Sequence, residues 1–232
     1  MNPIISKALS EGRTVLLEPE AKKLCSHYGI PVPKSRLVKS LDEAIKATQE
    51  IGFPVVVKIV SEDILHKSDA GCVVVGVSDA EELKAAYERV VGNALKFNPR
   101  ASIRGVLIEE MVPKGVEVAV GGLRDPEFGP AVMFGLGGIF IEVMRDVSFR
   151  IAPVSEEEAE EMMKEIRGFK ILQGYRGSEA VDLKALAKII VSASKMMAEN
   201  EEISQLDLNP IIASRQGAKA VDARVILSQP KK

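Results

Sequence analysis

The pattern of strands and helices changes near residue 103, and this change limits the folds that the chain can adopt. Before it, β-branched runs at 54–60 and 72–77 alternate with helices that follow capping motifs. After it, apolar runs separated by turn residues follow one another closely, at 105–109, 116–123, 131–134 and 139–143. The expected helices begin near residues 20, 41, 79, 155 and 182. The sequence therefore predicts an α/β (α+β) chain, with a small α/β lobe followed by a larger antiparallel sheet that carries helices.

The composition favours a folded protein with a sizeable core and argues against several other classes. The 232 residues are 46% hydrophobic and 28% charged, with a formal net charge of −2 and no basic tract, so no nucleic-acid partner is expected. No apolar run is long enough to cross a bilayer, and the N-terminus lacks a signal-peptide pattern. Cys25 and Cys72 form neither a disulfide framework nor a zinc motif. We expect a cytoplasmic protein with no membrane partner.

The closing segment carries an amide and a carboxylate on what we expect to be neighbouring strands. Asn209 and Asp222 lie thirteen residues apart, each after a short apolar run, and residues 214–218 between them favour a hairpin turn. Adjacent strands would present the two side chains next to each other. Such oxygen ligands suit Mg²⁺, which takes one or two protein oxygens and completes its octahedron with water and phosphate. The alternative is a surface hairpin in which Asn209 only begins a turn.

Three other polar residues in or beside apolar runs are candidate nucleotide ligands. Lys58 interrupts the run 55–60, where its ammonium group, aimed into a cleft, would meet a phosphate. The alternative is an exposed lysine on an edge strand. Glu109 begins a connector between the two lobes, where a carboxylate and backbone groups would meet ribose and adenine. Glu117 lies in the next strand, where solvent-facing alternation also explains it.

The glycine-rich segment 135–138 matches neither of the common phosphate-binding patterns. It is not a Gly-x₄-Gly-Lys-Ser/Thr loop, and its spacing differs from the dinucleotide-binding fingerprint. A tight turn would account for it. Nucleotide binding by this chain would therefore require another design.

The order and spacing of these features resemble the ATP-grasp family, and more closely the β-subunit of NDP-forming acyl-CoA synthetases. Succinyl-CoA synthetase β-subunits are more distantly similar. The resemblance runs over essentially the whole chain and is strongest at Lys58, 59–71, 109–121, 206–210 and Asp222. It implies an ATP-grasp fold, in which two lobes enclose a nucleotide cleft. The implied domains are an N-terminal helical segment on the larger lobe at 1–19, a small lobe at 20–107 and a large lobe at 108–232.

The resemblance also implies a role for each matching residue. Lys58 would bind nucleotide phosphate, Glu109 and Val112 would frame adenine and ribose, and Glu117 would reach the ribose or the metal-phosphate region. The remaining implied roles are phosphate contact by Arg150, Mg²⁺ binding by Asn209 and Asp222, and a glycine-rich segment beside the site at 135–138, followed by Glu142. Cys72 departs from the family pattern, which has a second glycine after Gly71, so a side chain stands where the loop would approach phosphate.

His66 is the candidate catalytic residue. It lies in a polar loop between two small-lobe strands, and a lone histidine in such a loop is usually an idle surface residue. Related acyl-CoA synthetases relay phosphate through phosphohistidine, and residues 65–69 match the β-subunit pattern. An imidazole with one free nitrogen is a competent nucleophile, so His66 is the implied phosphate acceptor. His27, at a helix end, is expected to be structural.

The implied reaction is acyl-CoA + ADP + phosphate ⇌ carboxylic acid + CoA + ATP, that of an ADP-forming acetate–CoA ligase. No CoA-binding domain is recognisable in the sequence. The resemblance therefore implies a CoA-binding α-subunit as partner in an α₂β₂ heterotetramer, with Mg²⁺ and ADP/ATP as cofactors. Two alternatives stay open: a self-sufficient ATP-grasp carboxylate ligase, and a non-catalytic nucleotide-sensing subunit. The sequence determines neither the acyl group nor the choice between ADP and GDP.

Overall fold

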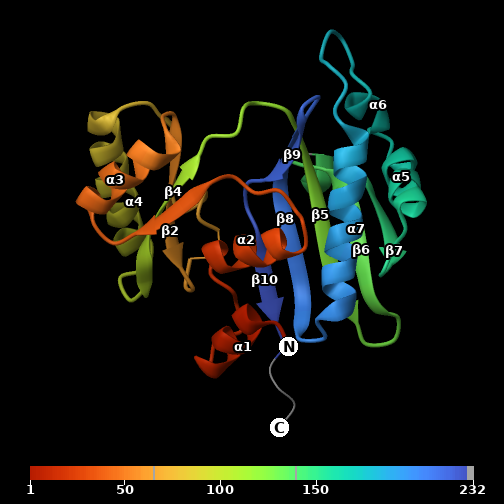
Figure 1. Cartoon of the computed structure of the whole chain (residues 1–232), viewed down its shortest axis with the longest axis horizontal. Coiled ribbons are helices and arrows are strands. Elements are labelled where there is room, and N and C mark those ends of the chain that lie inside the picture. The colour runs from red at the N-terminus through yellow and green to blue at the C-terminus, as the bar shows by residue number, and fades with distance from the viewer. Residues whose placement is uncertain (65, 139, 229–232) are drawn as a thin grey trace. The chain divides into compact units, whose positions relative to one another are not determined.

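The computed structural model describes residues 1–64, 66–138 and 140–228 (Figure 1). The chain divides into two compact units. The larger unit combines Met1–Val32 with Pro113–Lys232, and the smaller unit is Pro33–Val112. Both chain ends therefore belong to the larger unit. Within the described ranges, no helix has both the length and the apolar character needed to cross a membrane.

The smaller unit is a four-stranded antiparallel sheet with two helices, and its strand order is β1-β4-β2-β3. The strands are β1 (Ser35–Val38), β2 (Val55–Ser61), β3 (Val73–Val77) and β4 (Ile103–Glu110), and the helices are α3 (Leu41–Ile51) and α4 (Ala80–Phe97). Each helix begins at a residue whose side chain accepts a backbone N–H, Ser40 for α3 and Asp79 for α4. The valine-rich β2 is buried because it lies inside the sheet and packs against α4.

The larger unit is built on an antiparallel sheet with the order β10-β8-β5-β6-β7, in which β9 also pairs with β8. Its strands are β5 (Val116–Asp125), β6 (Gly129–Leu136), β7 (Val147–Ile151), β8 (Ile203–Ser214), β9 (Gly217–Ala220) and β10 (Arg224–Leu227). Its helices are α1 (Pro3–Ser10), α2 (Glu18–His27), the π-helical turn η1 (Phe140–Met144), α5 (Glu156–Glu165), α6 (Phe169–Leu172) and α7 (Leu183–Glu199).

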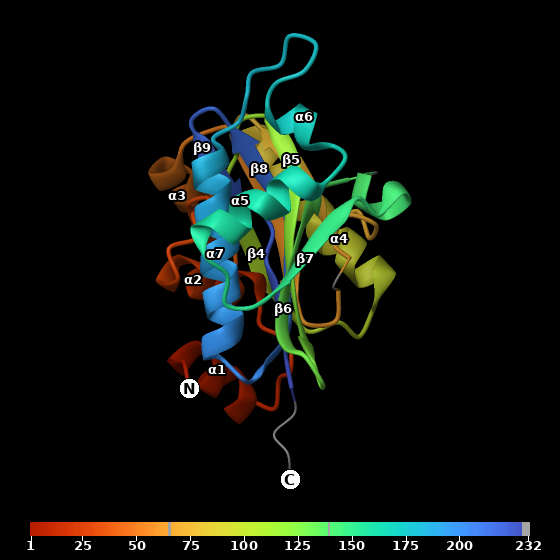
Figure 2. The ribbon, with the colours of Figure 1, turned by 90° about the vertical axis from the view of Figure 1, so that its right-hand side faces the viewer.

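Helices α5 and α7 pack on one face of this sheet, which we call the helix face (Figure 2). The packing is close, because a Cβ atom on Gly122 would lie 2.8 Å from Cγ of Met197 on α7. Side chains on the helix face, such as Val118 and Leu208, belong to the main hydrophobic core. Residues that alternate with them point to the opposite face, which we call the second face.

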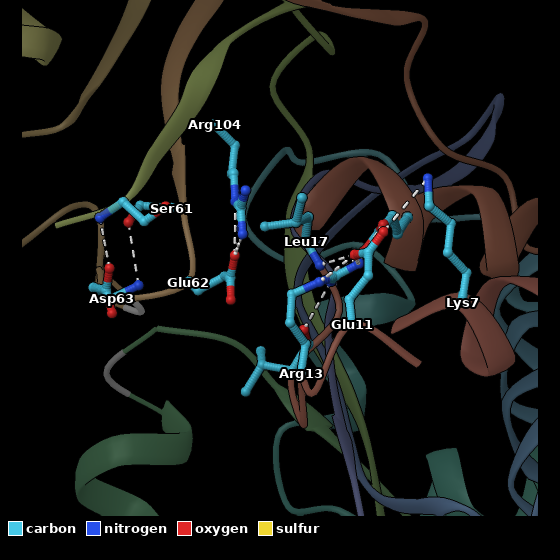
Figure 3. A network of polar contacts seen from close by, with 11 residues as sticks. Lys7, Glu11, Arg13, Leu17, Ser61, Glu62, Asp63 and Arg104 are labelled. Carbon is cyan, nitrogen blue, oxygen red and sulfur yellow. Dashed lines mark hydrogen bonds and ion pairs between the residues drawn. The ribbon is translucent and has the colours of Figure 1, made fainter. Parts of the chain in front are cut away.

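Ion pairs tie local segments together within each unit (Figure 3). In the larger unit, the guanidinium group of Arg13 donates to Glu11 and to Glu20. Glu20, in the first turn of α2, also accepts the N–H of Leu17, which precedes the helix. In the smaller unit, Nε of Arg104 donates to Oε1 of Glu62 at 2.7 Å. These contacts fix the segment before α2 and the end of β2.

The structure confirms the α/β (α+β) fold class but differs from the sequence analysis in several elements. The expected strand at 139–143 is wrong, since residues 140–144 form the π-helical turn η1 and β7 follows it instead. A short apolar run does not distinguish a strand from a helical turn. The unit boundaries also differ from the expected ones. Residues 20–32 fall in the larger unit because α2 packs on β10, and the smaller unit extends to Val112 because β4 continues to Glu110.

Candidate nucleotide and metal site

The hairpin of β8 and β9 places Asn209 opposite Asp222. In the observed register, Ile211 pairs with Ala220 on β9 and Asp207 pairs with Arg224 on β10. Continuing either pairing by two residues brings Asn209 and Asp222 to the same position. The expected hairpin is therefore confirmed, and its turn is the two-residue pair Arg215–Gln216 between Ser214 and Gly217.

A matched irregularity in both strands turns these two side chains to the second face. Leu208 and Ile211 both belong to the core of the helix face, although two residues separate them. Ala220 and Ala223 on the opposite segment show the same spacing. The N–H of Val221 donates to the carbonyl of Pro210 at 3.1 Å, which keeps the two segments paired through the irregularity.

The local polar environment of this pair fits a magnesium ion. Asn209 is exposed and Asp222 is half-buried, with its Oδ1 accepting the N–H of Ala223 at 2.9 Å. Among the described residues, no group of three or more His, Cys, Asp or Glu side chains is arranged to hold a metal. An amide oxygen and one carboxylate suit Mg²⁺, which commonly keeps water and substrate phosphate in its remaining positions. These two ligands therefore fit Mg²⁺ better than a metal whose coordination positions are all filled by protein side chains.

Glu117 lies on β5 next to the glycine-rich segment. The N–H of Gly137 donates to the carbonyl of Glu117 at 2.8 Å. A Cβ atom on Gly137 would lie 3.1 Å from Cβ of Glu117, and one on Gly138 would lie 3.7 Å from its Oε2. A side chain at Gly137 would therefore require Glu117 to shift by a few tenths of an ångström. The side chain of Glu142, which follows this segment in the sequence, lies outside the described part of the chain.

Lys58 and Glu109 form an ion pair inside the smaller unit. Nζ of Lys58 donates to Oε1 of Glu109 at 2.8 Å, and the side chains are 8% and 1% exposed. Because β2 lies between β3 and β4, the alternative of an exposed lysine on an edge strand is wrong. Glu109 lies within β4 rather than in the connector that follows it, where Val112 is half-buried.

The loop that carries His66 is anchored on both sides and exposed at the histidine. On one side, Oδ2 of Asp63 accepts the N–H of Ser102 at 2.7 Å. On the other, Nδ2 of Asn93 donates to the carbonyl of Gly71 at 2.7 Å, and Gly71 has a φ of +63°. The carbonyl of His66 accepts the N–H of Ala70, which closes a turn, while the His66 side chain is exposed. The loop is held at both ends while the imidazole of His66 stays accessible, which suits a side chain that must reach another molecule.

Arg150 lies apart from the other larger-unit candidates. It is on β7, which β5 and β6 separate from β8. Its guanidinium group donates to both carboxylate oxygens of Glu165 on α5, which raises the pKa of Arg150. The larger unit therefore places Glu117 on β5, the strand that pairs with the Asn209 strand β8, and it pairs Arg150 with Glu165 on helix α5.

The sequence analysis missed Asp207 and Arg224, which are paired across β8 and β10 beside Asn209. Both line a hollow of about 560 Å³, which also contacts Arg145 and apolar residues such as Met133 and Phe149. The signal was present, because Asp207 and Asn209 alternate with Leu206 and Leu208 and so share a face. Arg145 and Arg224 line this hollow and offer positive charge for an anionic group, and Arg224 follows Asp222 by two residues in the sequence.

Comparison with known proteins gives the same family for the whole chain. A model of the ATP-grasp domain matches residues 7–227. The chain is 51% identical over 224 residues to the acetate–CoA ligase (ADP-forming) I subunit beta of Pyrococcus furiosus, covering 97% of this chain and 96% of that protein.

Solved structures of one archaeal enzyme match equally fully. The dinucleotide forming acetyl-coenzyme A synthetase 1 of Ca. Korarchaeum cryptofilum, in complex with coenzyme A, Ca-AMPCP and HgCl+, has a TM-score of 0.96 and 52% identity, covering 97% of this chain and 98% of that chain. The Se-Met derivative of the same protein holds coenzyme A and Mg-AMPPCP, with a phosphohistidine segment pointing towards the nucleotide binding site. It has a TM-score of 0.85 and 49% identity over the same shares of the two chains.

The family assignment follows from the extent of these matches. The domain model spans nearly all of the chain, and the similarity to the Pyrococcus furiosus β-subunit covers almost the full length of both proteins. The two-sheet α/β fold agrees with this result. The chain belongs to the ATP-grasp family.

Proposed function

We propose that this chain is the nucleotide-binding β-subunit of an ADP-forming acyl-CoA synthetase. In this role it binds Mg²⁺ with ADP or ATP and joins a CoA-binding α-subunit in an α₂β₂ heterotetramer. The observation that carries the proposal is the register of β8, which sets Asn209 opposite Asp222 on the second face. The similarity over 96% of a protein named as a β-subunit supports the division of labour between two chains.

The residues of the larger unit would hold the charged end of the nucleotide. Asn209 and Asp222 each offer an oxygen to Mg²⁺, which when bound neutralises charge on the phosphates. Glu117, kept in place by the glycine turn at Gly137, presents its carboxylate to the ribose or the metal-phosphate region. Positioning and charge neutralisation are the main contributions that a protein makes to phosphoryl transfer.

The smaller unit would supply a cation and the phosphate acceptor. Lys58 would offer its ammonium group to a nucleotide phosphate, and the ion pair with Glu109 holds that group in place. Val112, in the connector, would frame the adenine. The exposed imidazole of His66 would accept the phosphoryl group from a phosphohistidine of the partner.

The phosphoryl group would pass through His66 in two steps. First, a ring nitrogen of His66 forms a bond to phosphorus while the bond between phosphorus and the partner's histidine breaks. Next, a terminal phosphate oxygen of ADP forms the new bond to phosphorus, and the imidazole of His66 leaves as the neutral base. The overall reaction is acyl-CoA + ADP + phosphate ⇌ carboxylic acid + CoA + ATP, with the acyl phosphate formed in the partner.

Reconstitution with the CoA-binding partner tests this proposal, and the chain offers a matched control. Its two histidines are His27 and His66. We expect ATP synthesis from acetyl-CoA, ADP and phosphate only in the complex, with loss of turnover and of acid-labile phosphate on this chain in His66→Asn but not in His27→Asn. Equal activity of both variants would remove the role of His66.

The same experiment separates the alternatives. Turnover by the chain without its partner would indicate a self-sufficient carboxylate ligase. Nucleotide binding without phosphoryl transfer in any complex would indicate a sensing subunit. Light scattering of the active complex checks the α₂β₂ assembly.

A further inference from the structure

A buried ion pair on α2 reaches the segment that carries Asp222. Nζ of Lys22 lies 2.8 Å from Oε1 of Glu18, one helical turn earlier, and it also donates to the carbonyl oxygen of Val221 at 2.9 Å. The side chains of Lys22 and Glu18 are 3% and 4% exposed. Burying two charges costs desolvation that their attraction often does not return, so stability alone does not account for this pair.

The Lys22 contact lies between two backbone contacts that the N-terminal segment makes with the same edge of the sheet. Helix α2 lies beside β10 (Figure 1). At one end, the N–H of Leu16 donates to the carbonyl of Val225 at 3.0 Å; at the other, the N–H of Ala220 donates to the carbonyl of Pro31 at 2.9 Å. Between them, where β9 has ended and β10 has not begun, the ammonium group of Lys22 meets the Val221 carbonyl.

Val221 is therefore held from two directions. Its N–H donates to the carbonyl of Pro210 on β8, and its carbonyl accepts from Lys22 on α2. The carbonyl of Val221 and the N–H of Asp222 belong to one planar peptide unit. A donor that fixes this carbonyl therefore also fixes the orientation of the peptide unit that leads into Asp222.

We infer that Lys22, supported by Glu18, is a positioning residue for the metal-binding pair, which sets the direction of the Asp222 carboxylate opposite Asn209. This inference rests on the proposed function, because it takes Asn209 and Asp222 as Mg²⁺ ligands. Groups that orient metal ligands commonly contribute about 10- to 100-fold to metal affinity. The N-terminal segment then serves the metal site as well as covering the sheet edge.

The test measures the coupling between metal and nucleotide in the full chain. Calorimetry gives the Kd of ADP with and without Mg²⁺. The Kd without Mg²⁺ divided by the Kd with Mg²⁺ measures the coupling. In Lys22→Met with Glu18→Gln, both charges of this ion pair are removed together. We expect this ratio to fall about tenfold or more while the metal-free Kd stays unchanged.

Two control variants separate positioning from general stability. Glu18→Gln alone retains the Lys22 donor and should change the ratio less than the double variant. Ser194→Ala removes a buried hydroxyl that accepts the N–H of Val154 in the same unit, so it should lower the Tm without changing the ratio. If the double variant does not fold, Lys22→Gln with Glu18→Gln replaces it, because the shorter amide side chain does not reach the Val221 carbonyl.

Asp222→Asn distinguishes failure of this inference from failure of the proposed function. If Asp222→Asn keeps the wild-type ratio, the metal assignment is wrong. If Asp222→Asn removes the coupling while the Lys22 variants keep it in full, the positioning inference is overturned and the metal assignment stands. A lower ratio in the Lys22 variants, but not in Ser194→Ala, supports the inference.

Discussion

Nζ of Lys58 lies 2.8 Å from Oε1 of Glu109 across two neighbouring strands of the smaller unit. Lys58 pairs with Leu107 and Val56 pairs with Glu109, so the two charged side chains are diagonal neighbours on one face of the sheet. Both are buried. The pair holds the ammonium group at a defined position, which in the proposed function would lower the cost of ordering a phosphate ligand.

Glu109→Gln should destabilise the protein strongly, because the ammonium group of Lys58 then lacks its buried carboxylate. Breaking one side of a buried ion pair costs about 3–5 kcal/mol, and urea unfolding measures this loss. The double variant Lys58→Met with Glu109→Gln should lose less stability than Glu109→Gln alone.

An exposed ion pair in the same unit gives the matched control. The side chains of Arg36 and Glu50 are 58% and 61% exposed. Glu50→Gln should change the free energy of unfolding by less than about 1 kcal/mol. Equal losses of unfolding free energy in Glu50→Gln and Glu109→Gln would show that burial does not increase the cost of breaking the Lys58 pair.

Gly137→Ala should weaken Mg·ADP binding by displacing Glu117. The added Cβ atom would lie 3.1–3.3 Å from Cβ and backbone atoms of Glu117, so the strand must shift by a few tenths of an ångström. Overpacking of this kind costs roughly 1–3 kcal/mol. Gly92→Ala in α4, where no atom lies within 4 Å of the new Cβ, should instead stabilise the helix by up to about 1 kcal/mol without changing ADP affinity. Unchanged binding in Gly137→Ala would count against a role for Glu117.

Gly71→Ala should slow phosphorylation of His66 while leaving ADP affinity intact. Gly71 has a φ of +63°, and a Cβ atom there would lie 2.8 Å from Nδ2 of Asn93, which donates to the Gly71 carbonyl. The left-handed conformation alone costs about 1–2 kcal/mol for a residue with a side chain.

Gly52→Ala controls for that backbone strain. Gly52 also has a positive φ, of +87°, but a new Cβ there would meet no neighbouring atom within 4 Å. It should destabilise the unit without slowing phosphate incorporation. The rate at which radiolabelled phosphate is incorporated into each variant is measured in the complex with the partner subunit. An equal effect of both variants would mean that the anchor at Asn93 has no specific role.

Stability should fall in alkaline solution, with Cys25 contributing to the loss. Burial raises the pKa of Cys25 from 9.0 to about 12, so the folded protein keeps the thiol neutral where the unfolded chain ionises it. Its stabilising contribution is complete below pH 9.0 and is lost as the pH rises towards about 12. The loss is at most about 1.4 kcal/mol per pH unit. Urea unfolding between pH 8 and about pH 10.5 should show a shallower decline in Cys25→Ala than in the wild type; parallel declines would contradict this assignment.

Local patterns predicted the elements that depend on neighbouring residues. The capped start of α3 at Ser40 and the hairpin of β8 and β9 follow from turn and cap residues only a few positions apart. The register that sets Asn209 opposite Asp222 follows from the same short hairpin. The π-helical turn at Phe140–Met144 was not predictable, because its apolar run also suits a strand.

Contacts between distant segments required the structure. Lys58 and Glu109 are 51 residues apart, and Lys22 and Val221 are 199 residues apart. Sequence periodicity shows which residues share a face of one element, but it does not show which element packs against it. The apolar neighbours of Lys58 predict a strand at 55–60, but no local pattern identifies Glu109 as the partner of Lys58.

The most direct test of the account is calorimetric titration of ADP into the isolated chain, with and without Mg²⁺, on the wild type and on Asn209→Ala with Asp222→Asn. Arg215→Ala with Gln216→Ala, at the exposed turn of the same hairpin, is the control. We predict Mg²⁺-dependent binding in the wild type and the control, and its loss in the Asn209 and Asp222 variant with the fold intact. A folded variant that binds Mg·ADP as the wild type does would contradict the account.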